Sequence, residues 1–372
     1  MYKEEISMIQ IGLLMGSFFV SGAGLYYHGF LLHSVTYNPW LPLLSGGLLS
    51  LLPSALAWYF CARFPRDNIV GVAQKLAGRW LGVVITLPLV LFHWALPLPV
   101  FRIAAELLVD VHLNQTAPVV LSTILLAIAC WIALMGTEVV TRTNDEHLVI
   151  IFPLTVVMFY LSIADIRLEL VLPVNQFDFS YWGRLDFYAS LMVFFGFSLP
   201  LFLNDSLGHS KKMYWVILTV TIVGILYLLL TLFLILGTLG MEMASSFEQP
   251  LKVKMTTLRQ MVFFQRVDIF LVLLWMFPTT TAMAAMIVTG ARAVGQWLNL
   301  TNYHPVIYVY FVVAFLLRSW FEAFQQSTQF LRWLGPLWGI FMIGTVGILL
   351  LLARFRRKKT AASRGTGGDC HG

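Results

Sequence analysis

Glycine and serine residues interrupt the first long apolar stretch of the chain near its middle. The segment from residue 16 to residue 24 reads Gly-Ser-Phe-Phe-Val-Ser-Gly-Ala-Gly. A helix inside a bilayer leaves backbone groups without helical partners only where those groups line a cavity or meet a ligand. The segment therefore predicts a binding site within the membrane, and its candidate residues are Gly16, Ser17, Ser21, Gly22 and Gly24.

The sixth apolar stretch carries a second interruption, Phe-Phe-Gly-Phe-Ser-Leu-Pro from residue 194 to residue 200. The apolar stretches divide into two sets of five, so the first and the sixth occupy corresponding positions. Interruptions at corresponding positions of two halves indicate an inverted repeat with a central substrate site. Glycine and proline also occur in ordinary membrane helices, so the inference depends on the matched placement. It adds Phe194, Gly196, Phe197 and Ser198 to the candidate site.

His93 lies in the middle of the third apolar stretch, with Pro88 and Pro97 nearby. A buried imidazole can bind a ligand or change its protonation. The alternative, which we favour, is a neutral histidine bonded to a backbone carbonyl that the prolines free. In both cases His93 is expected in the wall of the pocket.

The eighth apolar stretch carries three threonines, residues 279 to 281, directly after Pro278. Hydroxyl groups and freed carbonyls beside an interrupted first helix are suitable partners for Na⁺ or for a polar group of a ligand. Threonines in membrane helices also bond to their own backbone, and both interpretations stay open. Thr280 and Thr281 are included among the candidate ligand-binding residues, with Na⁺ as an open possibility there. No other metal site and no cofactor are predicted.

Charged residues gather near the predicted ends of the apolar stretches. The pairs Arg102/Glu106 and Arg318/Glu322 have i,i+4 spacing, and we interpret them as interfacial ion pairs that frame an outer entrance rather than as gates. The fifth stretch, from residue 147 to residue 162, contains no lysine or arginine, which disfavours a proton pump that uses a buried amine. Motifs for a nucleophile elbow, a phosphate loop or a zinc protease are absent, so an enzyme is not expected.

The composition places the chain in a membrane. Hydrophobic residues make up 59% and charged residues 11% of the 372 residues, whereas soluble domains carry about 25% charged residues. We predict an all-α integral membrane protein with a LeuT-like 5+5 inverted repeat, interrupted in helices 1 and 6. One membrane domain, 1–353, comprises repeats at about 8–164 and 187–353, followed by a basic tail, 354–372. The predicted spans are 8–30, 40–62, 80–101, 117–136, 148–164, 187–204, 214–239, 267–290, 304–321 and 334–353.

The basic residues predict the orientation of the chain. The net charge is +6, and the basic residues lie in short connections and in the tail from Arg354 to Lys359. Their excess on one side predicts that both termini are cytoplasmic and contact anionic lipid, with no nucleic-acid partner. Cys61, Cys130 and Cys370 have no disulfide or metal-ligand spacing.

The order of these features resembles the spore germination permease family, the B subunits of nutrient germinant receptors. The opening Lys3 to Gln10, the sixth stretch at Phe194 to Phe197, and Gln265 to Asp268 with Trp275 carry this resemblance. It covers essentially the whole chain, although Leu25 to Gly29 stand where the family pattern has a proline. The resemblance implies an amino acid/polyamine/organocation transporter fold. It also implies a small nutrient ligand, a membrane A subunit and a lipoprotein C subunit as partners, and the spore inner membrane as location.

We therefore expect a membrane subunit that binds a small nutrient, an amino acid by preference, in a central pocket and signals to partner subunits. A secondary active amino-acid transporter of the same fold is the first alternative. A structural scaffold for the receptor complex is the second.

Overall fold

The computed structural model describes residues 6–111, 113–171, 177–207, 213–257 and 268–365. Within these residues, nine helices are long and apolar enough to cross a membrane, and a tenth apolar helix, Pro118–Leu134, is slightly shorter. Each of the ten predicted spans thus corresponds to a helix or to a consecutive set of helical segments. We number these crossings in chain order.

The first five crossings include one short connecting helix, α4, between the second and the third. Their elements are α1 (Met8–Gly22), η1 (Ala23–Tyr27), α2 (His28–His33), α3 (Trp40–Arg63), α4 (Ile69–Ala77), α5 (Arg79–Ala95), α6 (Pro97–Val111), α7 (Pro118–Leu134) and α8 (Thr137–Ile163).

The last five crossings are preceded by two short 3₁₀ segments and contain one connecting helix, α12. Their elements are η2 (Leu168–Leu170), η3 (Ser180–Gly183), α9 (Leu185–Ser190), η4 (Leu191–Ser198), α10 (Leu199–Leu203), α11 (Met213–Ser245), α12 (Pro250–Thr257), α13 (Asp268–Trp297), α14 (His304–Leu317), η7 (Arg318–Phe321) and α15 (Phe324–Gly365).

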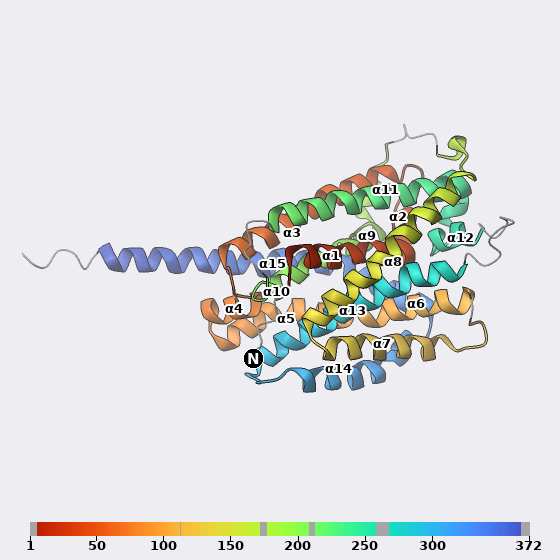
Figure 1. The fold of residues 1–372 in the computed structure, drawn as a ribbon. Helices are drawn as coiled ribbons and strands as arrows, with labels where there is room; N and C mark the ends of the chain where they lie inside the picture. Colours follow the sequence, from red (N-terminus) through yellow and green to blue (C-terminus); the bar gives the residue numbers. More distant parts are fainter. Residues whose placement is uncertain (1–5, 112, 172–176, 208–212, 258–267, 366–372) are drawn as a thin grey trace, which may run out of the picture.

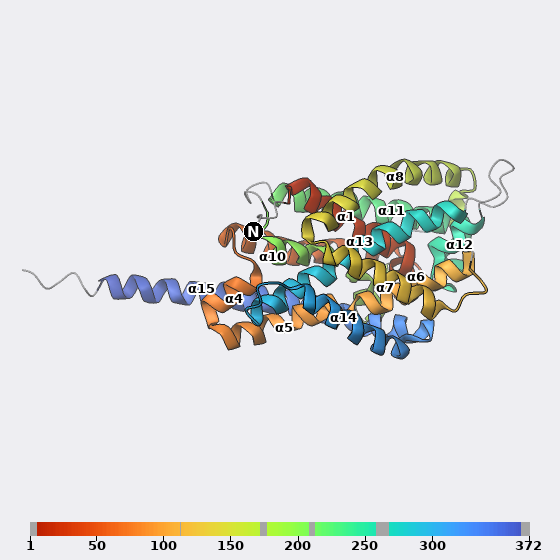
Figure 2. The ribbon, with the colours of Figure 1, turned by 60° about the horizontal axis from the view of Figure 1, so that its bottom comes forward.

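Crossings 1, 6 and 8 form the interior of the bundle (Figures 1 and 2). Helix α13 packs against α1, α5, α7 and α8, and 94% of its most apolar window is buried. The outer helices α7, α8, α11 and α14 instead expose large apolar side chains such as Trp131, Phe152 and Val312. Because such surfaces are stable only in hydrocarbon, the arrangement is that of a multi-pass membrane protein.

The interruption of the first crossing is confirmed, but it lies further along the helix than the glycine and serine pattern indicates. Residues 16–22 continue α1 as regular α-helix, and the hydrogen-bond pattern changes only in the π-helical segment η1. The carbonyl of Ala23 lies 3.0 Å from His28 Nδ1, so a side chain partners a backbone group at this irregular turn. Widened turns of this kind occur frequently at functional sites.

The interruption of the sixth crossing coincides with its predicted position. The segment η4 forms a 3₁₀ helix between α9 and α10, and the amide of Leu199 donates to the carbonyl of Gly196. Pro200 has no amide hydrogen and cannot bond to that carbonyl as the next α-helical turn would require. The tighter i→i+3 bond therefore replaces the α-helical one.

Three crossings exceed their predicted spans by the widest margins. The third continues through α6 to Val111, the fifth begins at Thr137, and the tenth extends from Phe324 to Gly365. Polar residues at these ends shortened the apolar windows without breaking the helices, because Glu, Lys, Arg and Ala are good helix formers. Residues 354–365, which the sequence assigns to the tail, thus continue α15.

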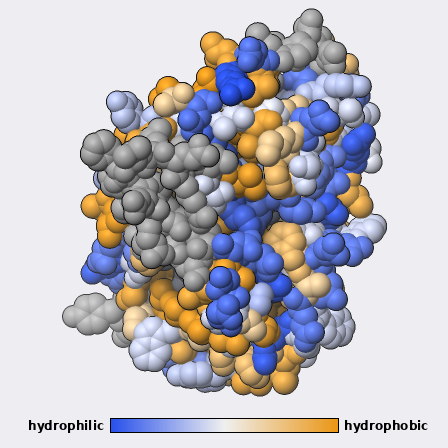
Figure 3. All heavy atoms as spheres, turned by 90° about the vertical axis from the view of Figure 1, so that its right-hand side faces the viewer, coloured by the Kyte–Doolittle hydropathy of each residue, from blue (hydrophilic) through white to orange (hydrophobic). Residues whose placement is uncertain are grey.

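The two ends of the bundle differ in their connecting helices. One end, here the α4 end, carries α4 and the projecting part of α15, and the other, the α12 end, carries α12 and the end of α6 (Figure 1). Hydrophilic side chains gather across the α12 end, as Figure 3 shows.

Candidate functional site

Glycines bring α1 of crossing 1 into direct contact with the interruption of crossing 6. A Cβ atom on Gly22 would lie 2.8 Å from Val193 Cγ2. One on Gly196 would lie 2.9 Å from Phe18 Cδ2 and 3.2 Å from the backbone of Met15. Only hydrogen fits at these positions without displacement of a neighbour, so both glycines serve the close approach of the two helices.

Aromatic rings fill the predicted pocket next to this contact. Phe194 and Phe197 are buried, and their ring centroids lie 5.3 and 6.2 Å from that of Phe19. The pocket is therefore closed by side chains in this structure. A ligand at this position requires the rings to rotate or the two crossings to separate.

Gly24 and Gly16 have different surroundings from Gly22. A Cβ atom on Gly24 would lie 2.5 Å from the ring of Trp275, which is fully buried on α13. Gly16 has no atom within 4 Å of such a position. It lines an apolar groove of about 1110 Å³ formed by α1, α8 and α11. Gly16 therefore lies outside the contact between crossings 1 and 6.

Hydroxyl and amide groups form a polar seam between crossings 1, 5 and 8, comprising Ser17, Ser21, Asn144, Thr279 and Thr281. The Oδ1 atom of Asn144 accepts from Ser17 Oγ at 2.6 Å and from Thr281 Oγ1 at 2.9 Å. Ser21 Oγ lies 2.7 Å from Thr279 Oγ1, which donates to its own helix. Ser21 is then the donor in this pair. The amide nitrogen of Asn144 has no partner within the described residues.

Two features of this seam differ from the sequence interpretation. Thr280 bonds to the carbonyl of Met276 at 2.7 Å, so its hydroxyl has the backbone-capping role left open above, whereas Thr279 joins the seam. Asn144 was missed because the predicted fifth span began at residue 148. The buried residues Thr137, Thr141 and Asn144 continue the helical spacing of the buried Ile151 and Met158. Extending this spacing toward the amino terminus from residue 148 would therefore have identified Asn144.

His93 connects crossings 3, 6 and 8 through two hydroxyl groups. Its Nδ1 lies 2.8 Å from Thr289 Oγ1 and its Nε2 lies 2.9 Å from Ser198 Oγ. The expected hydrogen bond between His93 and a freed backbone carbonyl is therefore wrong. The ring points from α5 across the bundle to hydroxyl groups of two other crossings. Both hydroxyls also lie within hydrogen-bond distance of carbonyls in their own helices. A neutral ring has one donor and one acceptor, so one hydroxyl must turn from its carbonyl toward the ring.

We predict that His93→Gln lowers the free energy of unfolding by less than about 1 kcal/mol, because an amide offers a donor and an acceptor at similar reach. His93→Ala is expected to cost about 2 to 4 kcal/mol, because it leaves a cavity among three helices. Denaturant unfolding of the purified protein in detergent measures both. Equal costs for the two variants would contradict the hydrogen-bonding role.

His28 is a second buried histidine, which the sequence analysis did not select. Its Nδ1 donates to the carbonyl of Ala23, so its Nε2 accepts from Thr231 Oγ1 at 3.0 Å. The ring thus connects the π-helical segment of crossing 1 to α11. The sequence did not reveal this role of His28, because a bond to the carbonyl five residues earlier depends on the π-helical turn, which was not predicted at this position.

Polar contacts close the α4 end beneath the interior crossings. Arg292 of α13 lies 3.0 Å from Asp205 Oδ2 and 3.2 Å from Ser206 Oγ, just after crossing 6. Asn68 donates to the same Asp205 oxygen at 3.1 Å. The amide of Ile6, just before crossing 1, donates to the carbonyl of Ser206. Crossings 1, 6 and 8 are therefore held together at this end.

A second set of contacts closes the α12 end over crossing 1. Arg332 of α15 binds Asp186 of α9 at 2.6 Å and lies 3.8 Å from Glu248. Its guanidinium also lies over the ring of Phe30. Gly29 also packs against these contacts, because a Cβ atom on it would lie 2.1 Å from the carbonyl oxygen of Glu248.

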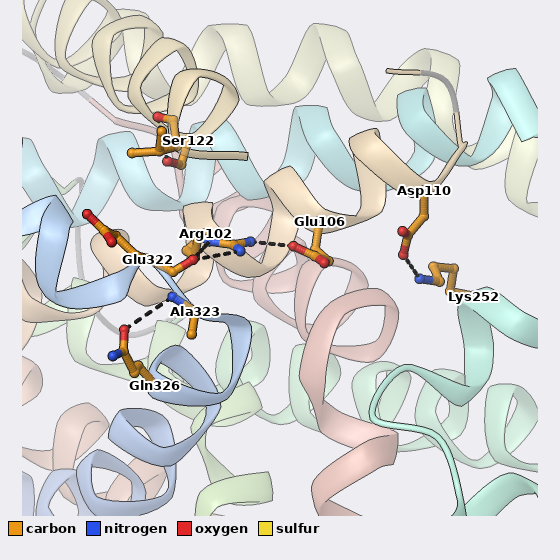
Figure 4. A network of polar contacts seen from close by, with 9 residues as sticks. Arg102, Glu106, Asp110, Ser122, Lys252, Glu322, Ala323 and Gln326 are labelled. Carbon is orange, nitrogen blue, oxygen red and sulfur yellow. Dashed lines mark hydrogen bonds and ion pairs between the residues drawn. The ribbon is translucent and has the colours of Figure 1, made fainter. Parts of the chain in front are cut away.

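The predicted ion pair between Arg102 and Glu106 is confirmed, with a distance of 2.5 Å (Figure 4). Arg102 also donates to the carbonyl of Glu322, at 3.0 and 2.9 Å. The predicted pairing of Arg318 with Glu322 is replaced by other contacts. Arg318 donates to the carbonyl of Phe315 and lies over the ring of that residue, because η7 tightens the helix at this point. Gln265 and Arg266 lie outside the described residues.

Comparison with known proteins identifies the family. A family model described as spore germination protein matches residues 5–327. The chain belongs to the spore germination permease family. The Spore germination protein YndE of Bacillus subtilis (strain 168) is 26% identical over 129 residues, which are 34% of this chain and 33% of that protein. The match thus spans about one third of the length of this relative.

Solved structures establish the fold of this spore germination permease. A structure of MhsT in complex with L-phenylalanine has a TM-score of 0.74 at 13% identity, covering 92% of this chain and 89% of MhsT. Mhp1, a nucleobase-cation-symport-1 family transporter, has a TM-score of 0.65 at 15% identity, with coverages of 91% and 78%. A Na⁺-coupled sialic acid symporter has 0.63 at 13% identity, with coverages of 90% and 78%. The predicted LeuT-like fold is confirmed.

Proposed function

We propose that this germination permease is a receptor subunit that binds a small nutrient between crossings 1 and 6 and signals to partner proteins. The contact between the two interrupted crossings carries this proposal. In it, Gly22 and Gly196 let the end of α1 pack directly against the 3₁₀ segment η4 of crossing 6, just before the π-helical segment η1 begins at Ala23. Such irregular backbone at mid-depth is suited to a ligand rather than to helix packing alone.

An amino acid fits the chemistry of this region. The candidate residues Phe194, Phe197 and Ser198 are uncharged and buried, so no side chain of that group supplies a counter-ion. Helix ends provide the alternative, because amino-terminal ends favour a carboxylate and carbonyl ends favour an ammonium group. MhsT, which shares the fold, is described with L-phenylalanine, which supports this ligand class.

The closed ends supply a mechanism for the signal. Arg292 with Asp205 closes the α4 end, and Arg332 with Asp186 closes the α12 end. A ligand that binds one arrangement of crossings 1 and 6 better than another shifts the population of these closed states. A membrane A subunit and a lipoprotein C subunit are the proposed readers of this shift.

The family and the distribution of basic residues support a proposed location. We place the membrane domain, residues 1–353 with repeats at about 8–164 and 187–353, in the spore inner membrane. Both termini and the α4 end face the cytoplasm, and the tail 354–372 lies beside anionic lipid.

A deletion strain tested against single nutrients examines the receptor role directly. Loss of the germination response to one amino acid, restored by the intact gene, is the expected result. Unchanged responses to every nutrient, with the partner subunits present, would favour the scaffold interpretation.

The polar seam favours transport as the second candidate function. Ser17, Ser21, Thr279 and Thr281 place four hydroxyl oxygens between crossings 1 and 8, and oxygen ligands of this kind suit Na⁺. The unpartnered amide nitrogen of Asn144 repels rather than attracts a cation. We therefore keep the receptor as the preferred function.

We predict that the protein in liposomes binds its nutrient but does not concentrate it under a proton gradient, because the seam contains no carboxylate or amine. Flux of labelled amino acids measures this, with empty liposomes as control. Uptake under a sodium gradient that Thr281→Val abolishes and Thr280→Val preserves would establish the transporter instead.

A further inference from the structure

A cavity of about 430 Å³ opens at the α12 end, away from the contact between crossings 1 and 6. Its walls come from the end of α6, the connection from α11 into α12, and the start of α15. The side chains that matter here are Glu106, Asp110, Phe247, Glu248, Lys252 and Phe324. Figure 4 shows Glu106, Asp110 and Lys252 at this end.

The wall of this cavity presents more negative than positive charge. Three carboxylates and one ammonium group line it. Arg102, which pairs with Glu106, is only 6% exposed and does not belong to the lining. Arg332, which lies 3.8 Å from Glu248, does not belong to the lining either. A partly enclosed surface with this balance concentrates cations.

Gln249 adds a second, independent observation. It lines the same cavity and is 6% exposed. Its amide nitrogen is buried and has no hydrogen-bond partner within the described residues. Buried donors are rarely left unpaired, so a group that carries an acceptor oxygen would satisfy it after a small rotation of the side chain.

We propose that this cavity binds a small solute that carries an ammonium group and an acceptor oxygen, at a site separate from the pocket between crossings 1 and 6. The acceptor oxygen accepts a hydrogen bond from the unpartnered amide nitrogen of Gln249. The ammonium group contacts Asp110, Glu248 and the oxygen of Glu106 that Arg102 does not engage. The remainder of the solute packs against Phe247 and Phe324, whose rings also attract cations.

The site has a consequence for the closure of the α12 end. Asp110 is paired with Lys252, and Glu248 lies near Arg332. An ammonium group bound between Asp110 and Glu248 competes with Lys252 and Arg332 for these two carboxylates. Occupation of the cavity therefore weakens the contact of α12 with α6 and the contact of Glu248, just before α12, with α15.

Benzylamine tests the ammonium contacts of this proposal with the full-length protein in lipid nanodiscs. Saturation-transfer NMR titrations compare benzylamine with benzyl alcohol, which has nearly the same shape but no charge. We expect saturable benzylamine binding that is at least about tenfold tighter than that of benzyl alcohol. Asp110→Asn and Glu248→Gln should each weaken it about fivefold, the effect of one partly exposed charge contact. Glu138→Gln, a partly exposed carboxylate of α8 paired with Arg142, is the matched control without effect.

Two results would overturn the proposal. Equal binding of benzylamine and benzyl alcohol would show that charge plays no part. Loss of benzylamine binding in Phe197→Ala, with none in Asp110→Asn, would place the amine between crossings 1 and 6. Both variants are first checked for a cooperative unfolding transition above the temperature of the titration. Failure of the receptor function leaves these binding results unaffected, so the two proposals are tested separately.

Discussion

Replacement of Gly22 or Gly196 by leucine is expected to abolish the germination response to the nutrient. A first side-chain carbon at Gly22 already lies 2.8 Å from Val193, and one at Gly196 lies 2.9 Å from Phe18. The larger leucine side chain therefore drives α1 away from the 3₁₀ segment η4 of crossing 6. Overpacking in a closed core costs about 1 to 3 kcal/mol, which leaves the protein able to insert in the membrane but alters the binding surface. Germination of spores that carry each variant measures the response.

Gly16→Leu is the matched control for these variants. It makes the same substitution on the same helix as Gly22, but the added carbon has no atom within 4 Å. We expect normal protein levels and an unchanged nutrient response. If Gly22→Leu and Gly196→Leu also respond at the normal nutrient concentration, the binding site lies elsewhere.

Loss of the Arg292 side chain is expected to open the α4 end. Arg292→Ala removes the contacts to Asp205 and Ser206 and leaves a half-buried carboxylate with fewer partners. Hydrogen bonds of charged groups are worth about 1.5 to 3 kcal/mol each, so the open population rises by about tenfold or more. Cys61 reports this opening, because it is fully buried and its thiol lies 3.5 Å from the carbonyl of Pro200 in α10.

The measurement is the rate of maleimide labelling at Cys61, with the other two cysteines replaced by serine. Arg142→Ala serves as control, because its ion pair with Glu138 is exposed. We expect at least a tenfold faster reaction in Arg292→Ala and no change in the control. Equal rates in both variants would show that the contacts of Arg292 do not hold the α4 end closed.

The candidate site was predictable in part. Gly22, Gly24 and Gly196, which the sequence analysis selected as ligand-binding candidates, lie at close contacts of crossings 1, 6 and 8. Three other candidates form hydrogen bonds across the bundle: Ser17 and Thr281 with Asn144, and Ser21 with Thr279. Within the part of the chain that the structure describes, these side chains bond to one another and do not line a pocket. Whether these residues bind the nutrient stays a prediction.

The sequence by itself determined the class of fold and the family. Apolar length, matched interruptions and few charges are local properties, because every span must be apolar and must satisfy its own backbone in hydrocarbon. The ten crossings, and the presence of an irregular turn in the first and the sixth, could therefore be assigned before any tertiary contact was known, although the turn of the first crossing lies further along the chain than predicted.

Only the tertiary structure decided which face of each helix meets which neighbour. His93 bonds to Ser198 and Thr289, which are 105 and 196 residues away, and Gly16 faces an open groove although Gly22 faces Val193. A rotation of a helix about its axis leaves its apolar composition unchanged but replaces all these partners. Inside an apolar bundle, packing of long-range neighbours selects that rotation, and local spacing does not encode it.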